Sequence, residues 1–349
     1  MPPLLDRHGR RPGVLRLSLT ARCNLACPYC CPDDRDPPGL LTLPERILVV
    51  RTAAALGFTL LRLTGGEPLL HDGLEELIEA LQPLRPQLRE IALTSNGALL
   101  TAARARALRR AGLERITLSL DGSDGASVAR MAGLSSAGST GPAEVARGQR
   151  LLEQVLAAIE HARAAGFDPE RGQLKLNAVI ARGRNDDQLV PLAALARRRG
   201  VELRLIEYMD VGNRNGWQAE QVVPAAEMVQ RLAVHWPLLP LGRPPRGTAS
   251  RWRYADGGGS VAVVASVSKP FCGDCDRLRV TADGVAYRCL FASQGHDLRP
   301  WLRPTADAAG LRQALEALWR ERTDRYSEER FTAGARTQTA PAEMAYLGG

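Results

Sequence analysis

The sequence predicts an α/β protein with a parallel sheet, a partial barrel of six strand–helix units followed by a C-terminal extension. The main observation is a regular alternation of strand-like and helix-like segments from residue 14 to about residue 209. Such alternation is typical of βαβ units, whose consecutive strands are parallel. Six strands are fewer than the eight that close a full barrel, so the predicted barrel is a partial (β/α)6 one.

Each element is predicted from its own pattern. A short apolar run bounded by turn residues predicts a buried strand, and apolar residues three and four apart predict a helix that covers it. The predicted strands are 14–20, 59–65, 90–97, 115–122, 173–181 and 201–209. The predicted helices are 44–57, 74–84, 102–112, 151–166 and 189–200.

Two segments interrupt this alternation. Residues 123–150 are rich in Gly, Ser and Ala and show no apolar face, which predicts a mobile surface loop inserted in the barrel. Residues 236–260 contain several Pro and Gly and predict a linker. We therefore divide the chain into a barrel region, residues 1–240, and a C-terminal region, residues 241–349.

Composition limits the kinds of partner. The net charge of +8 suits an anion such as nucleic acid, acidic lipid or a nucleotide triphosphate, although arginine-rich coding by a high-GC genome explains the bulk value equally well. No apolar run reaches the roughly 18 residues of a membrane span. The N-terminus lacks the apolar stretch of a secretory signal, so we expect a cytoplasmic protein.

The seven cysteines fall into two tight groups. Four lie within residues 23–31 and three within residues 272–289. A disulfide scaffold would be shorter and would spread its cysteines more evenly. In a reducing compartment, this distribution predicts two metal sites.

The first group is Cys23, Cys27 and Cys30 in a CxxxCxxC motif that directly follows a predicted strand. Three thiolates can hold three irons of a [4Fe–4S] cluster and leave the fourth iron open for a small molecule. A zinc site is the alternative, but zinc prefers four ligands, and Cys31 adjoins Cys30 too closely to chelate the same tetrahedral ion. Cys31 is then either an alternative ligand or an additional oxidation-prone thiol.

The second group is Cys272, Cys275 and Cys289, spaced as CxxC-x13-C. It again predicts a cluster with an open iron, with zinc as the alternative, and His296 fits no usual zinc spacing. Two arginines in the sequence RLRV, which follows Cys275, should point to the same face of a short strand. Two guanidinium groups beside an open iron would form an anion site.

The first motif resembles that of the radical S-adenosylmethionine superfamily, CxxxCxΦC with an aromatic residue at Φ, where this chain has Tyr29. The resemblance implies that S-adenosylmethionine chelates the open iron and is cleaved by one electron to a 5′-deoxyadenosyl radical. It also implies cofactor contacts at the matching positions. These are Tyr29, Gly66 in GGEP, Ser119 and Met209.

With both cysteine groups, nearly the whole chain resembles the GTP 3′,8-cyclase family of molybdenum cofactor (molybdopterin) biosynthesis. The resemblance is carried by LRLSLTARCNLACPYC, LRLTGGEPLL, LTSNG, LKLNAVIARGRNDDQ, LRLIEYMDVGNRNGW, PFCGDCDRLRVTADGVAYRCLF and the terminal Gly-Gly. It implies a partial radical-SAM barrel of the TIM type with two [4Fe–4S] clusters. It also implies conversion of GTP to (8S)-3′,8-cyclo-7,8-dihydroguanosine 5′-triphosphate.

The resemblance assigns roles to further positions and implies partners. Binding of GTP is expected at Arg16, Arg62, Thr94, Lys175, Arg277, Leu278 and Arg279. Support of catalysis is expected from Arg204, Gly348 and Gly349. The implied partners are an electron donor of the flavodoxin or ferredoxin type, a downstream cyclic pyranopterin monophosphate synthase and, as in many homologues, a second copy of the chain. Neither nucleic acid nor a membrane is expected.

Two other classes of protein are the alternatives. A peptide-modifying maturase also uses radical chemistry and an auxiliary cluster, but usually has more C-terminal cysteines and lacks the Cys-x-Arg-x-Arg arrangement. A zinc-stabilised nucleic-acid-binding protein would need four-ligand sites and a basic, aromatic-rich surface. Aromatic residues make up only 5% of this chain, which disfavours the latter class.

Overall fold

The computed structural model describes residues 3–135, 140–331 and 341–349. Twelve strands form one sheet in the order β12-β11-β10-β1-β2-β3-β4-β5-β6-β9-β8-β7. The first six strands are β1 (Val14–Ser18), β2 (Leu60–Thr64), β3 (Glu90–Ser95), β4 (Arg115–Ser119), β5 (Leu174–Ile180) and β6 (Glu202–Glu207). The others are β7 (Leu238–Gly242), β8 (Ser250–Tyr254), β9 (Ser260–Val264), β10 (Arg277–Val280), β11 (Val285–Tyr287) and β12 (His296–Asp297).

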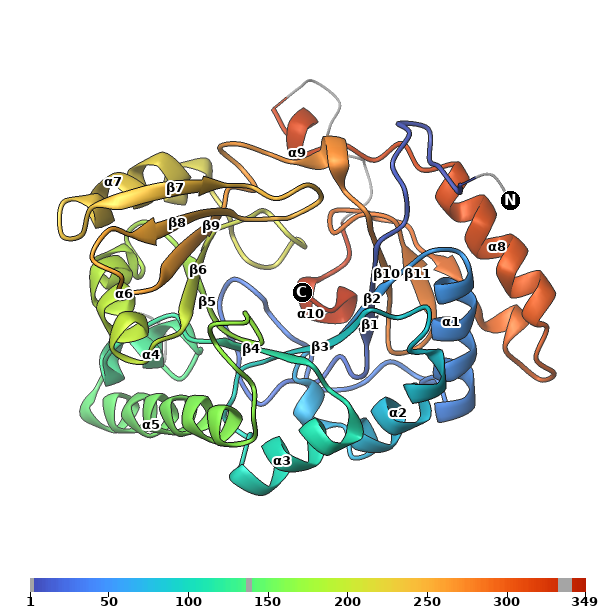
Figure 1. Ribbon diagram of the computed structural model, residues 1–349, viewed down its shortest axis with the longest axis horizontal. Helices are drawn as coiled ribbons and strands as arrows, with labels where there is room; N and C mark the ends of the chain where they lie inside the picture. Colours follow the sequence, from blue (N-terminus) through green and yellow to red (C-terminus); the bar gives the residue numbers. More distant parts are fainter. Residues whose placement is uncertain (1–2, 136–139, 332–340) are drawn as a thin grey trace.

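Eight of these strands are parallel neighbours and form the barrel wall. Strands β1 to β6 pair in chain order, β10 pairs in parallel with β1, and β9 pairs in parallel with β6. The remaining four strands are antiparallel additions at the two ends of the sheet. The residues after position 240 therefore extend the same sheet at both ends, and Figure 1 shows the sheet curving around a space that contains the C-terminus.

Helices cover the outside of the barrel (Figure 1). The longer ones are α1 (Leu43–Ala55), α2 (Leu74–Ala80), α3 (Ala102–Ala111), α4 (Gly125–Met131), α5 (Pro142–Ala164), α6 (Leu189–Arg198), α7 (Ala225–Ala233) and α8 (Ala308–Arg320). The C-terminal part adds the short helices α9 (Tyr326–Glu329) and α10 (Met344–Leu347). Single 3-10 turns are η1 (Pro68–Leu70), η2 (Gln82–Leu84), η3 (Asp186–Gln188), η4 (Ala219–Gln221), η5 (Cys272–Asp274) and η6 (Arg299–Trp301).

The helix ends follow from local sequence signals. Helix α1 begins with a capping box, in which Thr42 and Glu45 bond to each other's backbone N–H groups. Helix α3 begins at the N-cap Thr101 and ends at Gly112, whose φ of +107° lies in the left-handed region that glycine tolerates. These signals place both helices where the sequence predicts them.

The strand alternation separates an apolar outer face from a polar interior. Leu15 and Leu17 of β1 are buried in the main hydrophobic core with residues of the surrounding helices. Because successive side chains of a strand point to opposite faces, Arg16 and Ser18 face the inside of the barrel. The same alternation brings charged residues of several strands into the interior.

The predicted fold class is confirmed, since a parallel sheet with six βα strands and outer helices is present. The predicted loop over 123–150 is wrong in its described part, because α4 occupies Gly125–Met131 and α5 starts at Pro142. Asp124 caps α4, and Val128 and Met131 are buried, so few apolar residues suffice for this helix. Residues 136–139 of the predicted loop lie outside the described part.

The predicted linker over 236–260 is also wrong, since it contains the antiparallel pair β7–β8. Its Pro and Gly residues lie in and around a hairpin at the end of the sheet, where missing ladder hydrogen bonds are tolerated. None of the described helices has the length and apolar character needed to cross a membrane.

Candidate functional site

The first cysteine loop begins at the carboxyl end of β1 and is tied to its surroundings by backbone hydrogen bonds. The amides of Cys30 and Cys31 both donate to the carbonyl of Cys27, at 2.9 and 3.0 Å, and form a tight turn. The amide of Ala26 donates to the carbonyl of Ala132 at the end of α4, at 3.1 Å. The helix that replaces the predicted loop therefore supports the cysteine motif.

The GGEP segment after β2 approaches this loop closely. The amides of Gly66 and Glu67 donate to the carbonyls of Thr20 and Arg22, both at 2.8 Å. A Cβ on Gly66 would lie 2.2 Å from the carbonyl oxygen of Arg22, so only glycine fits. Close packing therefore explains the glycine at position 66, in addition to the predicted contact with the cofactor.

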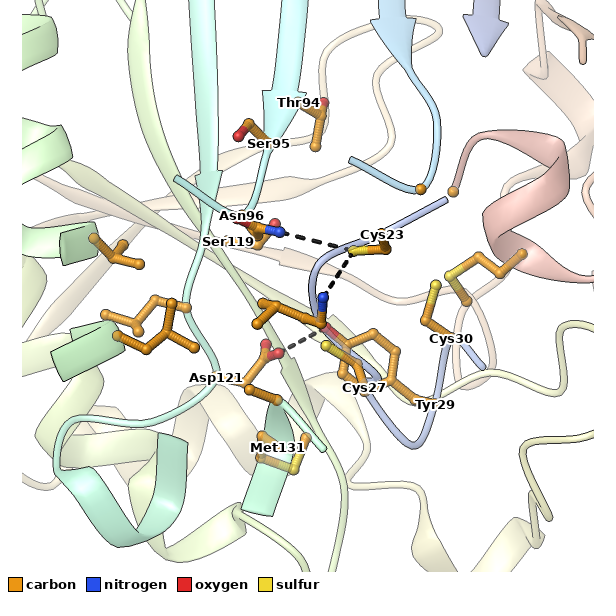
Figure 2. A pocket seen from close by; sticks show the side chains of 18 of the residues that line it. Cys23, Cys27, Tyr29, Cys30, Thr94, Ser95, Asn96, Ser119, Asp121 and Met131 are labelled. Atoms are coloured by element: carbon orange, nitrogen blue, oxygen red, sulfur yellow. Dashed lines mark hydrogen bonds between the residues drawn. The ribbon is translucent and has the colours of Figure 1, made fainter. Parts of the chain in front are cut away.

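Cys23, Cys27 and Cys30 line one cavity at the carboxyl end of the barrel strands. Figure 2 shows their sulfur atoms around this space, together with Tyr29, Thr94, Ser119 and Asp121. The cavity is also lined by Gly66, Met131, Met344 and Gly349. The structure therefore gathers most of the predicted cofactor positions, but Met209, which follows β6, is not among the lining residues.

The donor set fits a cluster better than a single metal ion. Within the described ranges, no three His, Cys, Asp or Glu side chains lie close enough together to hold a single ion. A cubane cluster attaches each thiolate to a separate iron, so its cysteines need not converge on one point. Cys23 accepts hydrogen bonds from the Leu25 amide at 3.4 Å and from the Asn96 side chain at 3.8 Å, donors of the kind that surround cluster sulfurs.

Burial raises the pKa of the Cys27 and Cys30 thiols, with further contributions from Asp121 and the neighbouring cysteines. Iron binding requires thiolates, and the positive metal removes the penalty that burial imposes on their charge. Cys31 differs from its neighbours, since it has a φ of +46° and its sulfur contacts the Pro28 carbonyl at 3.4 Å. Cys31 is not among the residues that line the cavity.

Asp121 is a cavity residue that the sequence analysis did not select. It accepts a hydrogen bond from the Tyr29 hydroxyl at 2.6 Å and one from the Val179 amide at 2.7 Å. Burial raises the pKa of this carboxyl to about 6, although both hydrogen bonds act in the opposite direction. Its position in the sequence could have indicated this, because Asp121 follows Ser119 and Leu120 at the end of a predicted strand, where barrel enzymes carry their functional residues.

The second cysteine group lies at the amino end of β10. The side chains of Arg277 and Arg322 donate to the Cys275 sulfur at 3.3 and 3.0 Å. Burial would raise the pKa of Cys275, but these two arginines lower it to about 7. Burial raises the pKa of Cys289 to about 12. Cys275 is thus held in a thiolate-stabilising environment that suits a metal ligand.

A row of three arginines lies in the barrel between the two cysteine groups. Arg279, Arg16 and Arg62 are paired neighbours on the parallel strands β10, β1 and β2, and the first two are buried. None of the three has an Asp or Glu partner among the described residues. Burial is the main cause that lowers the pKa of Arg16, that of Arg62 to about 9 and that of Arg279 to about 10. Repulsion from other arginines adds to it, from Arg279 for Arg16, from Arg115 and Arg204 for Arg62, and from Arg277 for Arg279. Uncompensated positive charge inside a barrel is a site for a polyanion.

The other predicted basic positions lie across the barrel on β5 and β6. Lys175 donates to Glu202 at 2.8 Å, and Arg204 lies 3.8 Å from the same carboxylate. Glu202 was not selected from the sequence. Leu278 is fully buried on the opposite face of β10 from Arg277 and Arg279, so any contact with substrate would involve its main chain.

The C-terminal tail enters the barrel and reaches the arginine row. The carbonyl of Gly348 accepts from Arg16 at 3.0 Å and from Arg279 at 2.9 Å, and the main-chain oxygen of Gly349 accepts from Arg16 at 2.5 Å. Gly348 has a φ of +70°, and a Cβ there would lie 2.2 Å from the Thr64 hydroxyl. Since Gly349 also lines the first cavity, the tail connects that cavity with the arginine row. Figure 1 shows the C-terminus inside the barrel.

Two family models match the chain. Residues 17–196 match the Radical SAM superfamily, and residues 201–328 match Molybdenum Cofactor Synthesis C. A solved structure of SuiB from Streptococcus suis bound to S-adenosylmethionine has a TM-score of 0.60 at 14% identity, covering 91% of this chain and 68% of that one. At this identity, the likeness shows the fold alone.

The curated relatives are far more similar. A GTP 3′,8-cyclase of Synechococcus sp. (strain CC9902) is 61% identical over 99% of this chain and 98% of its own length. A GTP 3′,8-cyclase of Acidothermus cellulolyticus is 46% identical over 94% of this chain and 89% of its own length. The chain therefore belongs to the GTP 3′,8-cyclase family of the radical S-adenosylmethionine superfamily.

Proposed function

We propose that this chain converts GTP to (8S)-3′,8-cyclo-7,8-dihydroguanosine 5′-triphosphate, the first step of molybdenum cofactor biosynthesis. The observation that carries the proposal is the row Arg279–Arg16–Arg62, which has no ion pair with an Asp or Glu side chain in the described chain and lies between two cysteine trios of one barrel. A triphosphate supplies the negative charge that this row lacks. Because the chain belongs to the GTP 3′,8-cyclase family, we identify this triphosphate as that of GTP.

The two cysteine trios would hold the two [4Fe–4S] clusters, Cys23, Cys27 and Cys30 the first, and Cys272, Cys275 and Cys289 the second. When bound, the first cluster and S-adenosylmethionine supply the carbon radical that removes a hydrogen atom from the sugar. Tyr29, Gly66 and Ser119 line the same cavity and would orient the cofactor, with Met209 assigned by the family motif alone.

The basic side chains would orient GTP between the two ends of the barrel. The phosphate oxygens would be bound by Arg16, Arg62, Arg277 and Arg279. Thr94 lines the cavity of the first cysteine group, inside the same barrel. Lys175 and Arg204 extend the basic interior to β5 and β6. Rigid positioning of this kind brings the sugar and the base into reacting geometry and excludes water, which limits side reactions of a radical.

The proposal extends to partners. An electron donor of the flavodoxin or ferredoxin type would reduce the first cluster. A cyclic pyranopterin monophosphate synthase would consume the product, and a second copy of the chain would form a homodimer. Each partner follows from the family and is testable by a binding measurement with the purified protein.

Anaerobic purification followed by product analysis tests the proposed function. We expect brown protein with about eight irons per chain, from two four-iron clusters. With GTP, S-adenosylmethionine and a reductant, mass spectrometry should detect an isomer of GTP together with 5′-deoxyadenosine. Colourless protein with stoichiometric zinc, or turnover of a peptide but not of GTP, would show that the proposal is wrong.

A further inference from the structure

Arg322 is a buried arginine on the protein side of the second cysteine group. It lies just after helix α8, and only 1% of its surface is exposed. Its position is 47 residues after Cys275, so no sequence motif connects the two. The structure nevertheless brings its guanidinium into direct contact with that cysteine.

The planar guanidinium contacts two atoms of the same residue. Nη2 of Arg322 donates to the Cys275 sulfur at 3.0 Å, and Nη1 donates to the Cys275 carbonyl at 2.7 Å. Nε donates to the carbonyl of Arg288 at 3.1 Å, next to Cys289 in the chain. A rigid fork with three such contacts holds both the main chain and the sulfur of Cys275 in place.

The charge of Arg322 also requires an anion at this position. A fully buried guanidinium is costly unless a negative group compensates it. The neighbouring carboxylates of Asp6 and Asp324 are 3.7 and 3.9 Å away, both farther than the sulfur. Asp6 makes a closer pair, at 2.5 Å, with Arg10. The two carboxylates contribute compensating charge from this longer distance, and the thiolate of Cys275 is the anionic group in closest contact with the guanidinium.

Arg322 and Arg277 contact the same sulfur but have different surroundings. Arg277 stacks on Phe271 with its guanidinium carbon 5.1 Å from the ring centre, and it belongs to the strand that carries the proposed phosphate site. Arg322 instead stacks on the buried Trp319 at 4.9 Å. Arg322 therefore lies away from the proposed phosphate site, whereas Arg277 is also one of the proposed phosphate-binding residues.

We propose that Arg322 is a positioning residue for the second iron–sulfur cluster, which fixes Cys275 as a ligand and stabilises the reduced form of that cluster. A positive N–H donor to a ligand sulfur favours the state with more negative charge, so it raises the reduction potential. The inference rests on the proposed function, because it assumes that Cys272, Cys275 and Cys289 hold a cluster.

The test compares Arg322→Gln and Arg322→Lys with the wild-type holoenzyme. The matched control is Arg320→Gln, which removes an arginine with a 53% exposed side chain at the end of the same helix. Each protein is reduced stepwise with dithionite, and both cluster signals are followed by electron paramagnetic resonance. The first cluster is identified by the change in its signal when S-adenosylmethionine is added.

We expect Arg322→Gln to shift the potential of the second cluster to a more negative value, or to lose that cluster alone, with the first cluster unchanged. Arg322→Lys, which keeps the charge but not the fork, should lie between wild type and Arg322→Gln, and Arg320→Gln should equal wild type. A wild-type potential and spectrum for the second cluster in Arg322→Gln would overturn the proposal. If Arg322→Gln fails to fold, wild-type values in Arg322→Lys would overturn it instead.

The iron content separates this inference from the proposed function. Wild-type protein with only about four irons per chain would contradict the second cluster itself. Wild-type protein with about eight irons, combined with unshifted variants, would contradict only the role of Arg322.

Discussion

Arg62 is the residue for which binding and folding can be separated most clearly. It lies in the barrel without an ion pair among the described residues. Burial and neighbouring arginines lower its pKa to about 9, an effect that Glu90 opposes only in part. Its charge therefore opposes folding, so Arg62→Ala should leave thermal stability unchanged or raise it. The presence of so costly a charge is explained if it binds substrate.

We predict that Arg62→Ala weakens equilibrium binding of GTP by about 10- to 100-fold. A charge-assisted hydrogen bond contributes roughly 1.5–3 kcal/mol, which corresponds to that range of dissociation constants. Arg106→Ala, which removes an exposed arginine on α3, is the control and should bind GTP normally. An unchanged dissociation constant for Arg62→Ala would remove Arg62 from the proposed phosphate site.

Cys275 should be alkylated at much lower pH than Cys289 in cluster-free, folded protein. Its pKa is lowered to about 7, whereas that of Cys289 is raised to about 12. Only the thiolate reacts, so a lowered pKa means that reactivity appears at lower pH. The rate of iodoacetamide modification at Cys275, measured by mass spectrometry, should reach half its maximum near pH 7.

The urea-unfolded chain is the control for this measurement. There, both cysteines should titrate near the ordinary value of about 8.5. The same pH profile for Cys275 in folded and unfolded protein would show that Arg277 and Arg322 do not stabilise its thiolate.

At the scale of elements, the contact between α4 and the first cysteine loop depends on Gly133. This residue has a φ of +68°, and a Cβ there would lie 2.0 Å from the carbonyl oxygen of Ala26. Gly183 has a similar φ of +72°, but a Cβ there would have no atom within 4 Å, so it provides a matched control. The two positions differ in packing and not in backbone conformation.

We predict that Gly133→Ala moves the loop and lowers the iron content of the first cluster, while Gly183→Ala keeps both clusters. A left-handed alanine costs both variants about 1 kcal/mol, so a difference between them reports the contact with the loop. Iron analysis and the cluster absorbance of anaerobically purified protein provide the measurement. Equal iron in both variants would mean that α4 does not position the cysteine loop.

The elements that the sequence predicted correctly are those with a repeated apolar pattern. Strand β5 and helix α6 lie within two residues of their predicted ends, because their alternating and helical patterns match their buried faces. Helix α4 was missed because its sequence GASVARM has only two large apolar side chains, and capping by Asp124 is a weak signal. Strand β7 was missed because Leu238–Gly242 contains a proline and lies at the sheet end.

The candidate site was predicted only where local motifs mark it. Cys23, Cys27, Cys30, Tyr29 and Gly66 stand in short patterns, and the structure places them around one cavity. Arg322 could not be found in this way, because its contact with Cys275 depends on how α8 packs against the sheet. A single arginine far along the chain carries no spacing signal.

At the scale of the whole molecule, the two ends of the chain complete one barrel. Residues 14–17 of β1 pair with residues 277–280 of β10, so the region that carries the second cysteine group directly adjoins the strand that leads to the first. No local pattern predicts this pairing, since it joins segments far apart in the sequence. It places the two cysteine groups at opposite ends of the barrel strands, with the arginine row between them.

The tail completes this arrangement, and Gly348→Ala tests it. We predict a large loss of GTP cyclisation, because the new methyl group would clash with the Thr64 hydroxyl at 2.2 Å and alanine is strained at a φ of +70°. Withdrawal of the tail would also release Gly349 from Arg16, so carboxypeptidase should remove C-terminal residues faster than from wild type. Gly216→Ala, with a φ of +60° and open space around it, is the control and should keep both properties. Full activity of Gly348→Ala combined with rapid trimming would mean that the docked tail is dispensable for turnover. Resistance of Gly348→Ala to trimming at the wild-type level would mean that the methyl group does not displace the tail.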